Sequence, residues 1–286
     1  MTAPRTTTVL IAALGGEGGG VLAGWLVDAA TRAGHWVQQT SIPGVAQRTG
    51  ATTYYIEIME RTEGDDRQPV MALTPSPGNV DVMVASELLE AGRALENGFV
   101  TPDRTTLIAS THRIFAIAEK SAMGDGRYDA ERVRRAAEQM AAKQVLFDMQ
   151  AAAEQAGTVI NAVLFGAMAG ANVLPLARDA LEEAIRAGGI AVDASLAGCA
   201  LGFDTARGGR PVAAVSKPSR ETSDEDGLGD RTLTDRINRN LPGMLQELAR
   251  EGARRLIDYQ GVGYARFYLD RLEPIAKIDA TRGGAA

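Results

Sequence analysis

The chain has 286 residues, of which 45% are hydrophobic and 23% charged, and this composition excludes a wholly disordered protein. Thirty basic residues against 36 acidic ones give a net charge of −6, a poor balance for a nucleic-acid binder. A single cysteine, Cys199, and two histidines exclude a disulfide framework, a cysteine-ligated zinc site and an iron–sulfur cluster held by this chain alone. No apolar run approaches the roughly 20 residues of a membrane helix and the N-terminus has no signal-like core, so we expect a cytoplasmic protein without membrane contact.

The first three-quarters of the chain alternates short apolar runs with helical patterns. Thr8–Leu14 is a continuous apolar run that ends in glycines, which predicts a strand buried on both faces, and a helix is expected over Val21–Ala33. Further strands are predicted at His35–Ser41, Ala51–Ile58, Val80–Ala85, Thr105–Ser110 and, more weakly, Val145–Phe147, with a helix over Asp129–Ala142. The alternation predicts an α/β fold, namely a three-layer, Rossmann-like sheet domain.

The C-terminal part has a different character. Residues 151–200 are rich in alanine and helical in period, and Leu174–Ile185 is an amphipathic helix with a stop at Gly188-Gly189. Glycine, proline and acidic residues over 204–232 predict a solvated linker. Two helices are expected beyond it, at Pro242–Tyr259 and Tyr264–Leu272, with an aromatic cluster that must be buried somewhere. The predicted domains are therefore the sheet domain 6–203, the linker 204–232 and a helical appendage 233–286.

A glycine-rich turn, Gly15-Gly16-Glu17-Gly18-Gly19-Gly20, joins the first strand to the first helix. In this context backbone N–H groups can point at a phosphate or carboxylate near the helix N-terminus. No Gly-Lys-Ser/Thr follows, which excludes a P-loop, and the uncharged Gln38–Ser41 lacks the acid that would hold the ribose of NAD. The alternative is that the glycines only permit a tight turn and close packing.

The loop 41–50 follows the second predicted strand and should emerge at the carboxyl edge of the sheet, where α/β proteins bind ligands. An arginine here can clamp a carboxylate or phosphate at two points, or it can simply pair with a surface acid. The residues singled out as facing substrate, coenzyme A or a partner are Ser41, Pro43, Gln47, Arg48, Thr49 and Gly50. Farther along, Gly124-Asp125-Gly126 is the opening of a thiamine-diphosphate motif, but the paired asparagines are missing, so a turn is favoured.

Taken together, three segments in order carry a family resemblance: Leu14-Gly-Gly-Glu-Gly-Gly-Gly-Val-Leu-Ala-Gly-Trp-Leu26, Thr40-Ser-Ile-Pro-Gly-Val-Ala-Gln-Arg-Thr-Gly-Ala-Thr-Thr-Tyr-Tyr55 and Ala118-Glu-Lys-Ser-Ala-Met-Gly-Asp-Gly126. They resemble the gamma-type domain of 2-oxoacid:acceptor oxidoreductases, and within that family the beta subunits of indolepyruvate:ferredoxin oxidoreductases. Glu17 departs from the glutamine usual in the family's loop, which should weaken any contact of that side chain with an anion. The helical region resembles the extra domain of the long bacterial subunit, so we expect a truncated or split form of it.

The resemblance implies thiamine-diphosphate-dependent oxidative decarboxylation of aryl 2-oxoacids such as indolepyruvate and phenylpyruvate, with coenzyme A as co-substrate and a ferredoxin-type electron acceptor. This chain is expected to bind no metal or cofactor alone. Thiamine diphosphate, Mg²⁺ and [4Fe–4S] clusters are expected in a partner alpha-type subunit, within a hetero-oligomer. Two alternatives stay open: the equivalent subunit for another 2-oxoacid, and a non-catalytic nucleotide-binding module.

Overall fold

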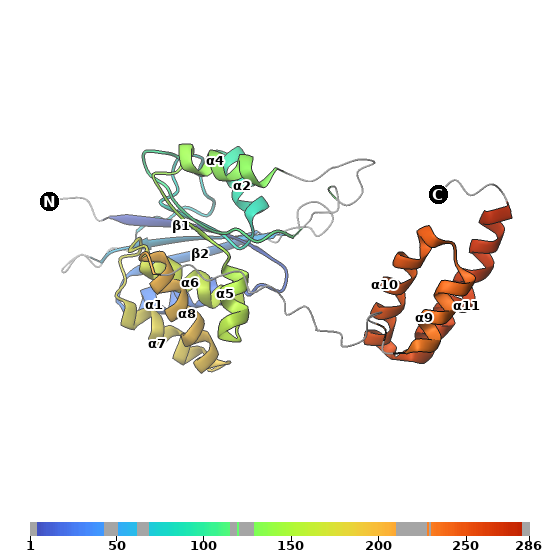
Figure 1. The fold of residues 1–286 in the computed structure, drawn as a ribbon. Helices are drawn as coiled ribbons and strands as arrows, with labels where there is room; N and C mark the ends of the chain where they lie inside the picture. The colour runs from blue at the N-terminus through green and yellow to red at the C-terminus, as the bar shows by residue number, and fades with distance from the viewer. Residues whose placement is uncertain are drawn as a thin grey trace. The chain divides into compact units, whose positions relative to one another are not determined.

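The computed structural model describes residues 5–42, 51–61, 69–114, 119, 129–209, 228 and 230–281. The chain divides into two compact units, Met1–Val215 and Ser216–Ala286. The strands are β1 Thr6–Leu14, β2 Trp36–Ile42, β3 Ala51–Met59, β4 Val82–Ala85, β5 Thr106–Ser110 and β6 Lys143–Phe147. The helices of the first unit are α1 Gly19–Arg32, α2 Leu88–Glu96, α4 Ala130–Met140, α5 Met149–Ala156, α6 Ile160–Gly170, α7 Arg178–Gly188 and α8 Val192–Ala206 (Figure 1).

Within the described residues, six strands form one mixed sheet in the order β2-β3-β1-β4-β5-β6. β1, β4, β5 and β6 pair in parallel, whereas β3 lies antiparallel between β1 and β2. β2 therefore runs in the same direction as β1. All six predicted strands are confirmed, and the mixed pairing adds the antiparallel β3 to the expected α/β sheet.

Helices cover both faces of the sheet, so the predicted three-layer α/β architecture is confirmed (Figure 1). Alternate residues of β1 point to opposite layers. Val9 and Ile11 pack in one apolar core with α1, α5, α6, α7 and α8, and Leu10 and Ala12 pack in a second core with α2 and α4. Burial of β1 on both faces explains its continuous apolar run.

Two helix boundaries differ from the sequence prediction. α7 begins at Arg178 rather than at Leu174, because Pro175 disfavours helical geometry at Leu174. In the bent segment before α7, Leu174 is buried and the carbonyl of Pro175 lies 3.1 Å from His35 Nε2. α8 continues to Ala206, into the segment that we expected to be linker.

The second unit holds three described helices rather than two: α9 Arg231–Asn240, α10 Gly243–Gln260 and α11 Val262–Thr281. α9 lies partly in the expected linker and was missed because only Leu233 and Ile237 mark its buried face. The predicted helix ended at Leu272, but α11 continues past it and past Pro274, because Ala276 beyond the proline still packs in the unit's own core. Of the aromatic cluster, Tyr259, Tyr264 and Phe267 are exposed on this unit and contact one another in turn, so their burial against another surface stays a prediction.

Candidate functional site

Five strands that run in the same direction, β1, β2, β4, β5 and β6, end at one edge of the sheet, the carboxyl edge. The first residue of β3 also lies there, since Ala51 pairs with Leu14 and Thr53 with Ile42. Both ends of the predicted loop 41–50 are therefore at this edge, and Ser41 is exposed at the end of β2. Its other candidate residues, Pro43, Gln47, Arg48, Thr49 and Gly50, lie outside the described residues, so their role stays a prediction.

The glycine loop turns from β1 into α1 at the same edge, as predicted. Gly16 and Gly18 have φ values of 88° and 73°, in the left-handed region that favours glycine. A Cβ on Gly18 would lie 2.7 Å from the side chain of Asn161, and one on Gly19 would lie 2.5 Å from the Cβ of Ala13. Tight packing thus accounts for these two glycines.

Other parts of the loop remain available to a ligand. Gly15, Gly16 and Gly20 are exposed, and no side chain caps the N-terminus of α1. The first-turn N–H groups of a helix have no intrahelical partner, so this end of α1 can accept an anion. Anion binding by Gly15–Gly20 stays a prediction.

The side chain of Glu17 turns toward the ends of β1 and β4. One carboxylate oxygen accepts hydrogen bonds from the backbone N–H of Leu14, at 3.1 Å, and from the hydroxyl of Ser86. Its other oxygen lies 3.6 Å from Nε2 of His112. Glu17 therefore ties the glycine loop to the ends of β1 and β4 and to the segment after β5.

His112 continues this polar chain toward β5. Its Nδ1 lies 2.8 Å from the hydroxyl of Ser110, and that hydroxyl accepts a hydrogen bond of 3.0 Å from the N–H of Met149 at the start of α5. The side chains of Glu17 and His112 are each only 12% exposed. The chain Ser86–Glu17–His112–Ser110 links the ends of β1, β4 and β5 and fixes the geometry of the edge.

Sequence reasoning missed Ser86, Ser110 and His112. A signal was present, because Ser86 follows the last residue of β4, Ser110 ends β5, and His112 is two residues beyond it. Polar residues at the carboxyl ends of parallel strands are candidates for a site.

A buried carboxylate, Glu87, lies beside this chain at the start of α2. Its oxygens accept hydrogen bonds from the N–H of Leu89 at 2.7 Å and of Ile114 at 3.2 Å. Nε of Arg113 is 3.1 Å from the same carboxylate, and Nη2 of Arg113 is 2.5 Å from Glu119. Burial raises the pKa of Glu87 above its usual value, and the hydrogen bonds and the charge of Arg113 oppose that rise.

Glu90, one turn further along α2, is also buried and pairs with Arg93. Burial raises the pKa of Glu90, and the nearby charges of Glu87 and Glu17 act in the same direction. Three carboxylates thus interact electrostatically around the N-terminus of α2. This edge of the sheet therefore carries buried charge that the apolar core does not require.

The described residues contain no group of three or more His, Cys, Asp or Glu side chains that could hold a metal ion. Cys199 is buried in α8, and burial raises the pKa of its thiol to about 12. A lone protonated thiol does not fit an iron–sulfur cluster, which needs several thiolates. Among the described helices none has the length and apolar character needed to span a membrane.

Residues 8–203 match the family "Pyruvate ferredoxin/flavodoxin oxidoreductase". The chain is 29% identical to the indolepyruvate oxidoreductase subunit IorB of Archaeoglobus fulgidus over 210 residues, 72% of this chain and 98% of that protein. IorB of Pyrococcus horikoshii is 30% identical over 182 residues, 62% of this chain and 84% of that protein.

The fold has counterparts among solved structures. A 2-oxoglutarate:ferredoxin oxidoreductase from Magnetococcus marinus superposes with a TM-score of 0.50 and 14% identity, over 74% of this chain and 32% of that one. Pyruvate oxidoreductase subunit PORC from Thermotoga maritima gives 0.48 and 20% identity, over 70% of this chain and 96% of that one. The family match ends before the helices α9–α11.

Proposed function

Because the chain belongs to the pyruvate ferredoxin/flavodoxin oxidoreductase family, we propose that it is the beta-type subunit of an indolepyruvate oxidoreductase. The observation that carries the proposal is the similarity to the Archaeoglobus fulgidus subunit across 98% of that protein's length. The reaction is the oxidative decarboxylation of an aryl 2-oxoacid to its acyl-coenzyme A, with two electrons passed to a ferredoxin-type acceptor. The relatives are named as subunits, which supports a hetero-oligomer. We propose that this hetero-oligomer is cytoplasmic.

The cofactors of this reaction belong to a partner alpha-type subunit. Thiamine diphosphate with Mg²⁺ supplies the decarboxylation chemistry, and [4Fe–4S] clusters carry the electrons away. The single, buried Cys199 supports this division, because one cysteine cannot supply the thiolates of a cluster. The contribution of this chain is binding, orientation and electrostatics around a cofactor that performs the chemistry.

The carboxyl edge is the part of this chain that faces the reactants. The glycine loop, with an uncapped helix end, follows Leu14 at this edge, and Leu14 pairs with Ala51, the first residue after the loop 41–50. Arg48 binds the carboxylate of the 2-oxoacid or a phosphate of coenzyme A through its planar guanidinium. The Glu17–His112 pair holds the glycine loop in place at this edge.

The test is reconstitution with the alpha-type partner from the same source. Reduction of a viologen dye is followed with this chain alone, with the partner alone and with both, in the presence of coenzyme A. Activity should appear only with both chains, and indolepyruvate and phenylpyruvate should give a higher kcat/KM than pyruvate or 2-oxoglutarate. Turnover by this chain alone, or full activity of the partner alone, would refute the assigned role. A preference for pyruvate, a branched-chain 2-oxoacid or 2-oxoglutarate would refute the aryl specificity only.

Arg48→Lys tests the role of the loop within the reconstituted complex. Lysine keeps the charge but loses the two-point geometry, so KM for the 2-oxoacid or for coenzyme A should rise about tenfold. Arg135, an exposed arginine on α4, gives the matched control as Arg135→Lys. Unchanged kinetics for both substrates in Arg48→Lys would make Arg48 a structural residue.

A further inference from the structure

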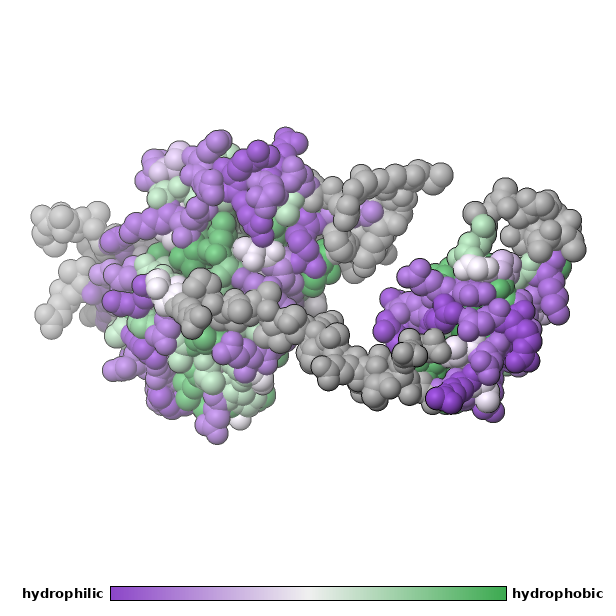
Figure 2. Space-filling view, in the orientation of Figure 1, coloured by the Kyte–Doolittle hydropathy of each residue, from purple (hydrophilic) through white to green (hydrophobic). Residues whose placement is uncertain are grey.

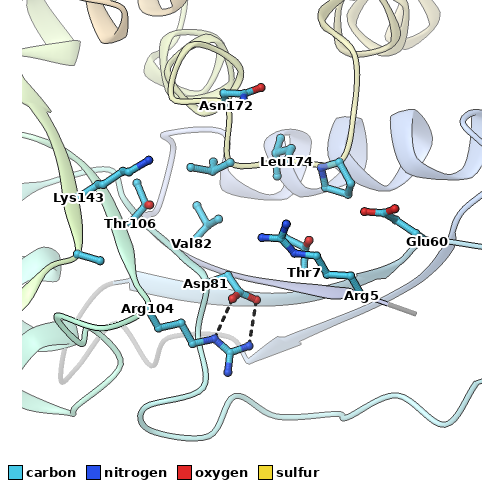
Figure 3. Close-up of a pocket in the computed structure, with 13 residues that line it drawn as sticks. Arg5, Thr7, Glu60, Asp81, Val82, Arg104, Thr106, Lys143, Asn172 and Leu174 are labelled. Atoms are coloured by element: carbon cyan, nitrogen blue, oxygen red, sulfur yellow. Dashed lines mark hydrogen bonds and ion pairs between the residues drawn. The ribbon is translucent and has the colours of Figure 1, made fainter. Parts of the chain in front are cut away.

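A cavity lies at the edge of the sheet opposite the carboxyl edge, where β1, β4, β5 and β6 begin. Its volume is about 400 Å³, within the range of roughly 300–1,000 Å³ typical of small-molecule sites. The connection between α6 and α7 closes one side, with Asn172 and Leu174 facing the strand ends (Figure 3). The proposed oxidoreductase function does not use this edge.

The polar lining has an excess of positive charge in a chain whose net charge is −6. Three cations, Arg5, Arg104 and Lys143, face two carboxylates, Glu60 and Asp81. Two of these five charges already compensate each other within the protein, as an ion pair between Arg104 and Asp81. Nε of Arg104 lies 2.8 Å from Asp81, which lowers the pKa of that carboxyl against the opposing effect of burial.

The other two cations have no such partner. Neither the guanidinium of Arg5 nor the ammonium of Lys143 makes an ion pair or hydrogen bond with any described residue. Figure 3 shows the two groups on either side of Val82, both directed into the cavity. The hydroxyls of Thr7 and Thr106, at the starts of β1 and β5, are nearby neutral groups that also line it.

One wall is apolar. Val82 and Leu174 are buried in the fold, and Val173 and Pro175 extend the wall along the connection before α7. A ligand for this cavity therefore needs a negative group for Arg5 and Lys143 and an apolar body for these apolar residues. Burying apolar ligand area against this wall adds affinity that an inorganic ion cannot gain.

We propose that this cavity binds a small organic monocarboxylate, with the carboxylate between Arg5 and Lys143 and the apolar part against Leu174. The lining has a surplus of one positive charge, which matches a monoanion. The site lies at the edge that the proposed oxidoreductase function does not use, so the two proposals stand or fall separately. Ligand binding to it is measured on this chain without a partner or cofactor.

The test is a calorimetric titration of the full chain with benzoate, with benzamide and with inorganic phosphate. Benzamide keeps the shape of benzoate and removes its charge, and phosphate keeps the charge and removes the apolar body. Benzoate should bind with a millimolar or lower dissociation constant, and both controls should bind at least tenfold more weakly. Equal binding of benzamide would refute the role of the cations, and equal binding of phosphate would refute the organic ligand class.

Variants locate the site. Arg5→Gln and Lys143→Gln should each weaken benzoate binding about tenfold, because a charge-assisted hydrogen bond is lost. The matched control is Arg135→Gln on α4, outside the cavity, which should leave the affinity unchanged. Tryptophan fluorescence of each variant verifies folding, and either variant alone is sufficient for the test. The proposal would be overturned if Arg135→Gln weakened benzoate binding as much as Arg5→Gln and Lys143→Gln do. It would also be overturned if no binding were found at a benzoate concentration about 10-fold above the expected dissociation constant.

Discussion

Helices α6 and α8 approach each other closely at Gly166, and a larger residue there would overlap with the backbone of α8. A Cβ added to Gly166 would lie 1.8 Å from the carbonyl oxygen of Cys199 and 2.6 Å from its carbonyl carbon. These are backbone atoms of the facing helix, so no side-chain rotation relieves the overlap. Gly202 of α8 approaches Val163 of α6 as closely, with 2.1 Å from an added Cβ to the carbonyl oxygen. Gly166→Ala therefore requires the two helices to separate by more than 1 Å.

The cost follows from two opposing effects. Overpacking of a close-packed core costs about 1–3 kcal/mol, and a clash between backbones belongs at the upper end of that range. Alanine returns about 1 kcal/mol of helix propensity. We therefore expect Gly166→Ala to lower the free energy of unfolding by about 2 kcal/mol, which is about 4–8 °C in Tm for a unit of this size.

Tryptophan fluorescence during urea unfolding measures this change in the first unit alone. Both tryptophans, Trp25 and Trp36, lie in that unit, and the ring of Trp25 is 5.6 Å from the ring of Phe165, the neighbour of Gly166. The matched control is Gly24→Ala in α1, where an added Cβ meets no atom within 4 Å. This control should gain about 0.5–1 kcal/mol. If Gly166→Ala is as stable as Gly24→Ala, the close approach of α6 and α8 is wrong.

Three further predictions concern single side chains. In urea unfolding, Glu17→Ala should destabilise the first unit by about 3 kcal/mol. Glu17→Gln should cost about half as much, because glutamine keeps one acceptor oxygen, and equal losses in the two variants would contradict this. Because burial raises the pKa of Cys199 to about 12, its thiol should react with a disulfide reagent at pH 8 only after urea is added, and rapid labelling of the native protein would contradict that burial. The native pKa of Glu90 is above its unfolded value, so the native state binds more protons and its stability falls as pH rises through the raised pKa. Glu90→Gln should remove that part of the fall. In urea unfolding from pH 4 to 8, the free energy of unfolding of the variant minus that of the native chain should therefore increase with pH. A difference that stays constant with pH would contradict the raised pKa.

The strands could be predicted from sequence, but not their neighbours. Thr8–Leu14 and Val80–Ala85 are buried on both faces, and that burial leaves a continuous apolar run. Nothing in Ala51–Ile58 indicates that β3 inserts between β1 and β2 in the antiparallel direction, because pairing depends on partners distant in sequence. The glycine loop could be predicted for the same local reason as the strands.

The partners of Glu17 could not be predicted in this way. Ser86 is 69 residues away in sequence, and only the parallel pairing of β1 with β4 brings it to the loop. In the sequence, position 17 belongs to a loop that suits an anion, and a glutamate there is expected to weaken the contact. The structure shows that a carboxylate is accepted there because it faces two donors and an imidazole rather than an anion.

Both ends of β1 lie beside charged groups that the apolar core does not require. At its carboxyl end, Leu14 leads into a loop held by a largely buried carboxylate–imidazole pair. At its amino end, Thr7 lines a cavity with two cations that have no acidic partner among the described residues. A core needs neither feature, since buried charge costs free energy unless it is compensated and unpaired surface cations add no packing. The carboxyl edge compensates its charges internally, with Arg113 against Glu87 and Arg93 against Glu90. The amino edge leaves Arg5 and Lys143 for a group from outside the chain, and that difference is the physical reason to look for a ligand there.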